Sequence, residues 1–154
     1  LGGNLSCSQI GYQRMLGCWR SFRRHEIPFD EAVQCEQCRY SMDSAYAATG
    51  RLLAHFPDLT AIFAVSDVMA IGCIRALKDL GKRVPEDISV VGYDGIPMAS
   101  YSVPRLTTIK QDAGSFAQRG VDLLLEAIAQ SKAPPRHELV PFQLVEGESV
   151  SQLN

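Results

Sequence analysis

The segment from residue 61 to residue 112 constrains the fold most, because it predicts a strand, a helix and a second strand in close succession. Ala61–Val65 is a short apolar run of strand length, and Val68–Leu80 has the length and composition of a helix. Ile88–Tyr93, with the sequence ISVVGY, is almost continuously apolar and suits a strand buried on both faces of a parallel sheet. The predicted fold class is therefore α/β, a three-layer parallel sheet with helices on both faces.

Polar residues and a glycine stand where these elements are expected to end. Ser66 and Asp67 lie between the first strand and the helix, and we expect Asp67 to be the N-cap. Gly81 suits the left-handed residue that closes a helix. Ligands of open α/β sheets bind beyond the carboxyl ends of the strands, where Ser66, Asp67 and Asp94 are expected to lie. The sequence therefore predicts a binding site at this edge of the sheet.

The flanking sequence continues the alternation of helices and strands. Three more helices are predicted over residues 8–24, 43–56 and 114–130, the second of them capped by Asp43 or Ser44. Strand candidates are residues 32–37, which form a weak one, 106–110 and 139–145. Residues 96–102 are expected to form a short irregular or helical segment.

Charge, hydropathy and motifs argue against several classes of function. The net charge of −2 argues against direct binding to nucleic acid, which needs concentrated lysine and arginine. The sequence contains no apolar run of transmembrane length and no signal-peptide pattern. It also lacks the glycine-rich, nucleophile and metal motifs of common enzymes. We therefore predict no catalytic residues, no metal, no cofactor, no membrane partner and no enzymatic activity.

Five cysteines at irregular spacings are typical of reduced thiols in a cytoplasmic protein. Cys35 and Cys38 are the one pair with a motif spacing. A structural zinc site needs four ligands, and no second such pair exists. A redox pair remains an alternative interpretation.

Three motifs resemble, in order, the effector-binding domain of the lactose/galactose repressor (LacI/GalR) family of bacterial transcription regulators. They are SDVMAIG at residues 66–72, LGKRVPEDISVVGYD at residues 80–94 and PRLTTIKQD at residues 104–112. Weaker matches at residues 1–3, 14–19 and 40–46 extend the resemblance over almost the whole chain.

The resemblance implies a periplasmic-binding-protein-like (type I) core, in which two lobes enclose an effector. Residues 1–101 would form mainly the C-terminal lobe. Residues 106–131 would supply a crossover strand and a helix of the other lobe, and residues 137–150 a returning strand. The chain would then be a fragment that lacks the DNA-binding domain and most of the other lobe. The helix at residues 114–130 would thereby lose its packing surface.

The resemblance also implies ligand-binding residues, which are Arg14, Asp94, Ser66, Tyr40, Gln111, Ser8 and Ile10. Arg14 offers a planar fork of donors, and Asp94 can accept two sugar hydroxyls or neutralise Arg14. Tyr40 aligns with an aromatic residue that stacks on the ligand. The alternatives are a solvated helical arginine, a turn aspartate and a core or surface tyrosine. Helix capping is the alternative for Ser66.

A homodimer is the second implication. The helix that begins at Val68 is apolar on all sides over its first two turns, so it needs a cover on both sides. In the family this helix and the segment after Asp94 lie in the dimer interface. The interface candidates are Val68, Ile71, Arg75, Pro97 and Tyr101.

The function expected on this basis is that of a cytoplasmic, LacI-type regulator that senses a small-molecule effector, a sugar by preference. Operator DNA would be bound by a domain outside this chain. The first alternative is a sugar-binding receptor of an ABC-type transporter, which shares the two-lobe fold. The second is an α/β enzyme of flavodoxin-like topology.

Overall fold

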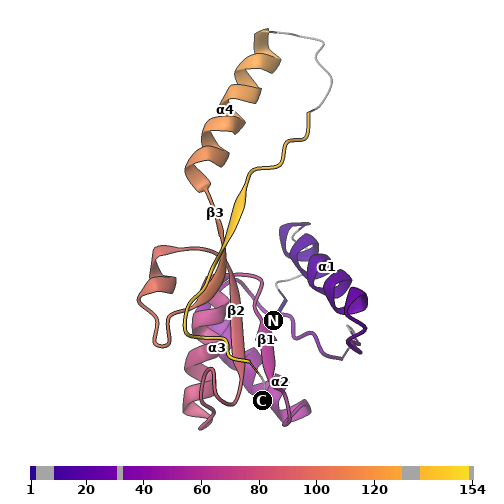
Figure 1. The fold of residues 1–154 in the computed structure, drawn as a ribbon, viewed down its shortest axis with the longest axis vertical. Helices are drawn as coiled ribbons and strands as arrows, with labels where there is room; N and C mark the ends of the chain where they lie inside the picture. Colours follow the sequence, from indigo (N-terminus) through magenta and orange to yellow (C-terminus); the bar gives the residue numbers. More distant parts are fainter. Residues whose placement is uncertain (3–8, 31–32, 130–135, 153–154) are drawn as a thin grey trace.

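The computed structural model describes residues 1–2, 9–30, 33–129 and 136–152. The elements in chain order are α1 (Gln9–Arg24), α2 (Met42–His55), β1 (Ala61–Phe63), α3 (Asp67–Asp79), β2 (Ser89–Asp94), the 3-10 helix η1 (Pro97–Ser100), β3 (Thr107–Gln111), α4 (Ala113–Ala129) and β4 (Phe142–Val145). The strands form one sheet in the order β1-β2-β3-β4 (Figure 1). β1, β2 and β3 are parallel, and β4 is antiparallel to β3. The sheet is thus mixed with a parallel majority, and the predicted fold class is confirmed.

The two faces of β2 differ. Val90 and Gly92 are buried on the face that α3 covers. Ser89, Val91 and Tyr93 are half-buried and line a groove beneath α1. The prediction of a strand buried on both faces is therefore wrong for the second face, because α1 covers it incompletely.

Helix α3 forms the centre of the core. Met69, Cys73 and Leu77 are fully buried, and α3 packs against both α2 and β2. Its C-terminus closes as predicted, with Gly81 at φ +74° and the Lys82 amide donating to the Leu77 carbonyl.

Three local predictions need correction. Ser66, not Asp67, caps α3, because its hydroxyl accepts the Met69 amide. Ser41, not Asp43 or Ser44, caps α2 by accepting the Ser44 amide. Residues 33–37 form no strand. Gln37 makes only an isolated parallel bridge to Gly2.

Helix α4 projects away from the remaining elements, at the far end of β3 and β4 (Figure 1). None of its described side chains is buried, although the helix carries an apolar stripe. The most exposed apolar side chains on it are those of Phe116, Leu124, Leu125 and Ile128, each more than half accessible to solvent. Among the residues that the structure describes, this helix has no packing surface that buries its apolar stripe, as expected.

Candidate functional site

An arginine and an aspartate form an ion pair where β2 ends. Arg14 projects from the second turn of α1, and its Nη2 lies 2.8 Å from Oδ1 of Asp94, the last residue of β2. The Arg14 Nη1 also donates to the Val65 carbonyl, just beyond β1, at 2.7 Å. The guanidinium therefore links α1 to the carboxyl ends of two parallel strands.

Neighbouring side chains hold this pair in place. The Arg14 guanidinium carbon lies 4.1 Å from the ring centroid of Tyr93, in a cation–π arrangement. Gln111 at the end of β3 donates through Nε2 to Asp94 Oδ1 at 3.3 Å. Side chains from α1, β2 and β3 thus meet at the edge predicted from the order of the elements.

The environment of Asp94 is unusual in backbone and in charge. Its φ of +125° lies outside the regions that residues with a side chain favour. Burial raises the pKa of the Asp94 carboxyl, and the Arg14 guanidinium offsets this shift only in part. A strained, partly desolvated carboxylate next to the guanidinium donors is well suited to accept hydrogen bonds from ligand hydroxyl groups.

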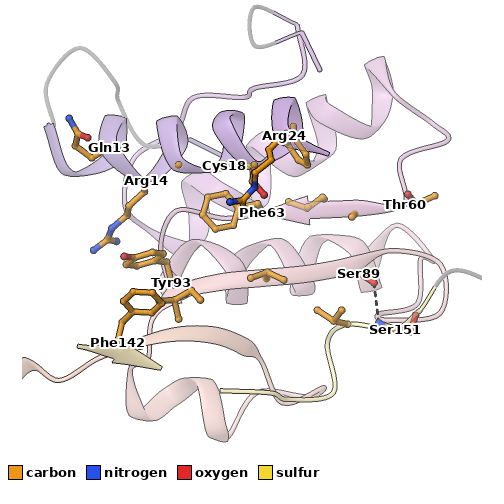
Figure 2. A pocket seen from close by; sticks show the side chains of 18 residues that line it. Gln13, Arg14, Cys18, Arg24, Thr60, Phe63, Ser89, Tyr93, Phe142 and Ser151 are labelled. Carbon is orange, nitrogen blue, oxygen red and sulfur yellow. Dashed lines mark hydrogen bonds between the residues drawn. The ribbon is translucent and has the colours of Figure 1, made fainter. Parts of the chain in front are cut away.

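Two members of this cluster, Arg14 and Tyr93, line one end of a groove of about 1000 Å³ between α1 and the sheet, whereas Asp94 and Gln111 lie outside its lining (Figure 2). Arg14, Tyr93 and Phe142 lie at that end, whereas Thr60, Ser89 and Ser151 lie at the other. The wall between them is mostly apolar.

The structure brings Arg14, Asp94 and Gln111 together, but it does not do so for every predicted ligand residue. The Ser66 hydroxyl is buried and engaged in capping α3. Tyr40 and Ile10 are 42% and 63% exposed, and no described contact joins them to the cluster. Ser8 lies outside the described residues.

Tyr93 was missed, because it reads as one more apolar position of a buried strand. Alternation along β2 is the signal that would have found it, since Tyr93 and Val91 share the face under α1. The Val65 carbonyl was missed because a backbone acceptor has no signature in a sequence.

In the part of the chain that the structure describes, there is no group of three His, Cys, Asp or Glu residues arranged to hold a metal. Cys38 and Cys73 are buried thiols, and burial raises the pKa of both.

Cys73 is expected to resist thiol reagents. Burial in α3 raises the pKa of its thiol to about 11. Only the thiolate reacts, so at pH 8 modification should be roughly 100-fold slower than for an ordinary cysteine. The folded chain holds this thiol proton more tightly than the unfolded chain. The free energy of unfolding should therefore fall as the pH rises from 9 towards 11. Reaction with a chromogenic disulfide, in a variant whose other four cysteines are alanine, measures the rate. Fast reaction without urea would contradict the burial.

The fold and this cluster define the class of protein as an α/β lobe whose polar side chains converge beyond the ends of parallel strands, which is where ligands of open α/β sheets bind. Residues 7–150 match the family described as periplasmic binding protein-like domain, and the chain belongs to that family. It is 34% identical over 147 residues to the HTH-type transcriptional regulator MalR of Clostridium butyricum, covering 96% of this chain and 43% of that protein.

Solved structures agree with this assignment. The lac repressor dimer bound to operator and the anti-inducer ONPF superposes with a TM-score of 0.87 at 34% identity, over 97% of this chain and 50% of that chain. The complex of the transcriptional regulator CelR with cellobiose superposes with a TM-score of 0.85 at 31% identity, over 90% of this chain and 42% of that chain. The resemblance to the lactose/galactose repressor family is confirmed. The chain spans about two fifths of the length of the curated relatives it matches.

Proposed function

We propose that this chain is the effector-binding and dimerisation portion of a LacI-type transcription regulator, which binds a small carbohydrate between two lobes. The observation that carries the proposal is the convergence of Arg14, Asp94 and Gln111 at the carboxyl ends of the strands. The protein binds and releases its ligand without turnover.

The chemistry of the cluster favours a polyhydroxylated ligand. The Asp94 carboxylate can accept hydrogen bonds from ligand hydroxyl groups, and the N–H groups of Arg14 and Gln111 can donate hydrogen bonds to hydroxyl oxygens. An aromatic side chain such as Tyr93 offers a face for sugar C–H groups. The cellobiose bound in the CelR complex supports a sugar as the ligand class.

We propose the domain arrangement that the family resemblance implies. Residues 1–101 belong mainly to the C-terminal lobe, residues 106–131 reach into the other lobe, and residues 137–150 return. The unburied apolar stripe of α4 supports this arrangement, because a second lobe would cover it. Operator DNA is bound by a further domain, and the protein acts in the cytoplasm. The described residues include no helix able to cross a membrane.

Effector binding acts by population shift. A ligand that contacts both lobes stabilises one closure angle, and the closure angle sets the spacing of the two DNA-binding domains of a dimer.

The experiment is calorimetric titration of the protein that contains this chain with cellobiose, a pentose and a purine base. We expect saturable binding of a sugar and a sugar-dependent change in affinity for operator DNA. Sugar binding without any DNA affinity would favour the transport receptor instead. Turnover of a bound compound would favour the α/β enzyme.

The dimer is proposed to form along α3 and η1. Val68 and Ile71 are half-buried, whereas Arg75 and Pro97 are exposed and Tyr101 is 81% exposed. Large apolar side chains left open to solvent next to a buried helix are typical of a protein interface. The lac repressor, which this chain resembles, was solved as a dimer.

Sedimentation should show a dimer that Ile71→Glu converts to a monomer. A glutamate here would be desolvated without a partner on pairing. The control is Lys82→Glu, which lies away from the proposed interface. A strict monomer at high concentration would contradict the proposal.

A further inference from the structure

Asp67 is a fully buried carboxylate at the start of α3, and the effector site does not use it directly. Its Oδ2 accepts the backbone amides of Gly95 at 2.7 Å and Ile96 at 2.8 Å. Its Oδ1 accepts the hydroxyl of Thr108 at 2.5 Å. Asp67 does not cap its own helix, because Ser66 does so. All three of these bonds therefore join α3 to other segments.

Those segments are the two that hold Asp94. Gly95 and Ile96 follow Asp94 directly, and Thr108 lies on β3 three residues before Gln111, which donates to Asp94. The Asp67 carboxylate thus forms hydrogen bonds with both the loop after β2 and the neighbouring strand β3. With its side chain fully buried, Asp67 itself cannot touch a ligand bound at Arg14 and Asp94.

Two backbone features show that the junction is built around this carboxylate. Asp94 has a φ of +125°, a conformation that persists only where its surroundings hold it, and the bonds to the next two amides supply such restraint. Gly92 leaves the space that the carboxylate occupies, because a Cβ there would collide with Asp67 Oδ1.

We propose that Asp67 is a positioning residue that holds the Asp94 carboxylate against Arg14. This inference rests on the proposed function in one respect, which is that Asp94 is a ligand-binding residue. The geometry that Asp67 imposes is present without ligand, so it can be tested apart from ligand binding.

The test is NMR spectroscopy of the ¹⁵N-labelled full chain without ligand. Asp67→Asn keeps the shape but removes the charge and one acceptor, and Thr108→Val removes one hydroxyl donor. The matched control is Thr49→Val, which removes a buried hydroxyl bonded to the Ala45 carbonyl on α2, away from the site. Two quantities are measured: amide hydrogen exchange at Gly95 and Ile96, and the guanidinium resonances of Arg14, which report its ion pair.

In Asp67→Asn we expect the Gly95 and Ile96 amides to exchange roughly 10- to 100-fold faster, as for loss of hydrogen bonds to a charged acceptor. We also expect the Arg14 resonances to lose the signature of the ion pair. Thr108→Val should shift both quantities in the same direction by less, and Thr49→Val should leave the Arg14 signature unchanged even if it lowers stability.

An Arg14 signature that persists in folded Asp67→Asn would overturn the inference and leave Asp67 a structural residue only. If Asp67→Asn does not fold, Thr108→Val decides, and an unchanged Arg14 signature there overturns it equally. If both variants disturb Arg14 while the protein that contains this chain binds no sugar, the positioning role stands and the proposed function fails.

Discussion

Replacing Gly72 with alanine is expected to lower the free energy of unfolding by about 1–3 kcal/mol, the usual cost of overpacking a core. A Cβ at this position of α3 would lie 2.8 Å from the Cα of Met42, at the start of α2. The obstacle is backbone, so it cannot rotate away. The two helices must separate, and the core between them loses its packing.

Gly50→Ala is the matched control, and its expected effect has the opposite sign. Gly50 lies within α2, and nothing is within 4 Å of the Cβ that alanine would add. Alanine there should stabilise the chain by about 0.5–1 kcal/mol, through the lower helix propensity of glycine. Urea unfolding followed by circular dichroism measures both variants. Equal effects of the two substitutions would show that α2 and α3 are not in close contact.

Replacing Arg14 with methionine should weaken binding of the cognate sugar by on the order of 100-fold, because several charge-assisted hydrogen bonds are lost together. Methionine keeps most of the apolar length of the side chain, so packing on Tyr93 is largely retained. What disappears is the ion pair to Asp94 and the bond to the Val65 carbonyl. Asp94 is left partly buried without its cation.

Arg83→Met is the control for this prediction, since it also removes an arginine paired with an aspartate. Arg83 is 70% exposed and pairs with Asp87 four residues along the chain, whereas Arg14 is only 14% exposed. Exposed ion pairs of this kind contribute little to stability. Calorimetry on both variants gives the affinities. Arg14→Lys separates charge from geometry, because lysine keeps the charge and loses the fork. Wild-type affinity in Arg14→Met would refute this site.

Much of the fold could be predicted because its signals are local. The apolar runs that became β1, β2 and β3 and the glycine that closes α3 act within a few residues of each other. The errors were of two kinds. The capping residues were displaced by one to three positions, because serine and aspartate both serve as caps. The strand expected over 32–37 did not form, because among the described residues 33–37 only Gln37 makes a β-bridge, an isolated one to Gly2.

The candidate site was predicted in part. Arg14 and Asp94 were proposed from the chemistry of their side chains and from a family resemblance, and the structure places them in contact. For Ser66 the alternative of helix capping describes its observed bond. Asp67 was predicted to cap its helix, yet it joins three segments. This role could not be predicted, because its partners are 28 to 41 residues away in the chain.

The sequence by itself determined the order of helices and strands, the edge of the sheet where polar residues gather and the family to which the chain belongs. These depend on hydrophobic spacing and on residue types near one another in the chain. Only the tertiary structure decided that α1 leaves a groove over β2 and that Asp67 binds the loop after Asp94. Each of these depends on contacts between distant segments, and such contacts are determined by packing of the whole chain rather than by any local pattern.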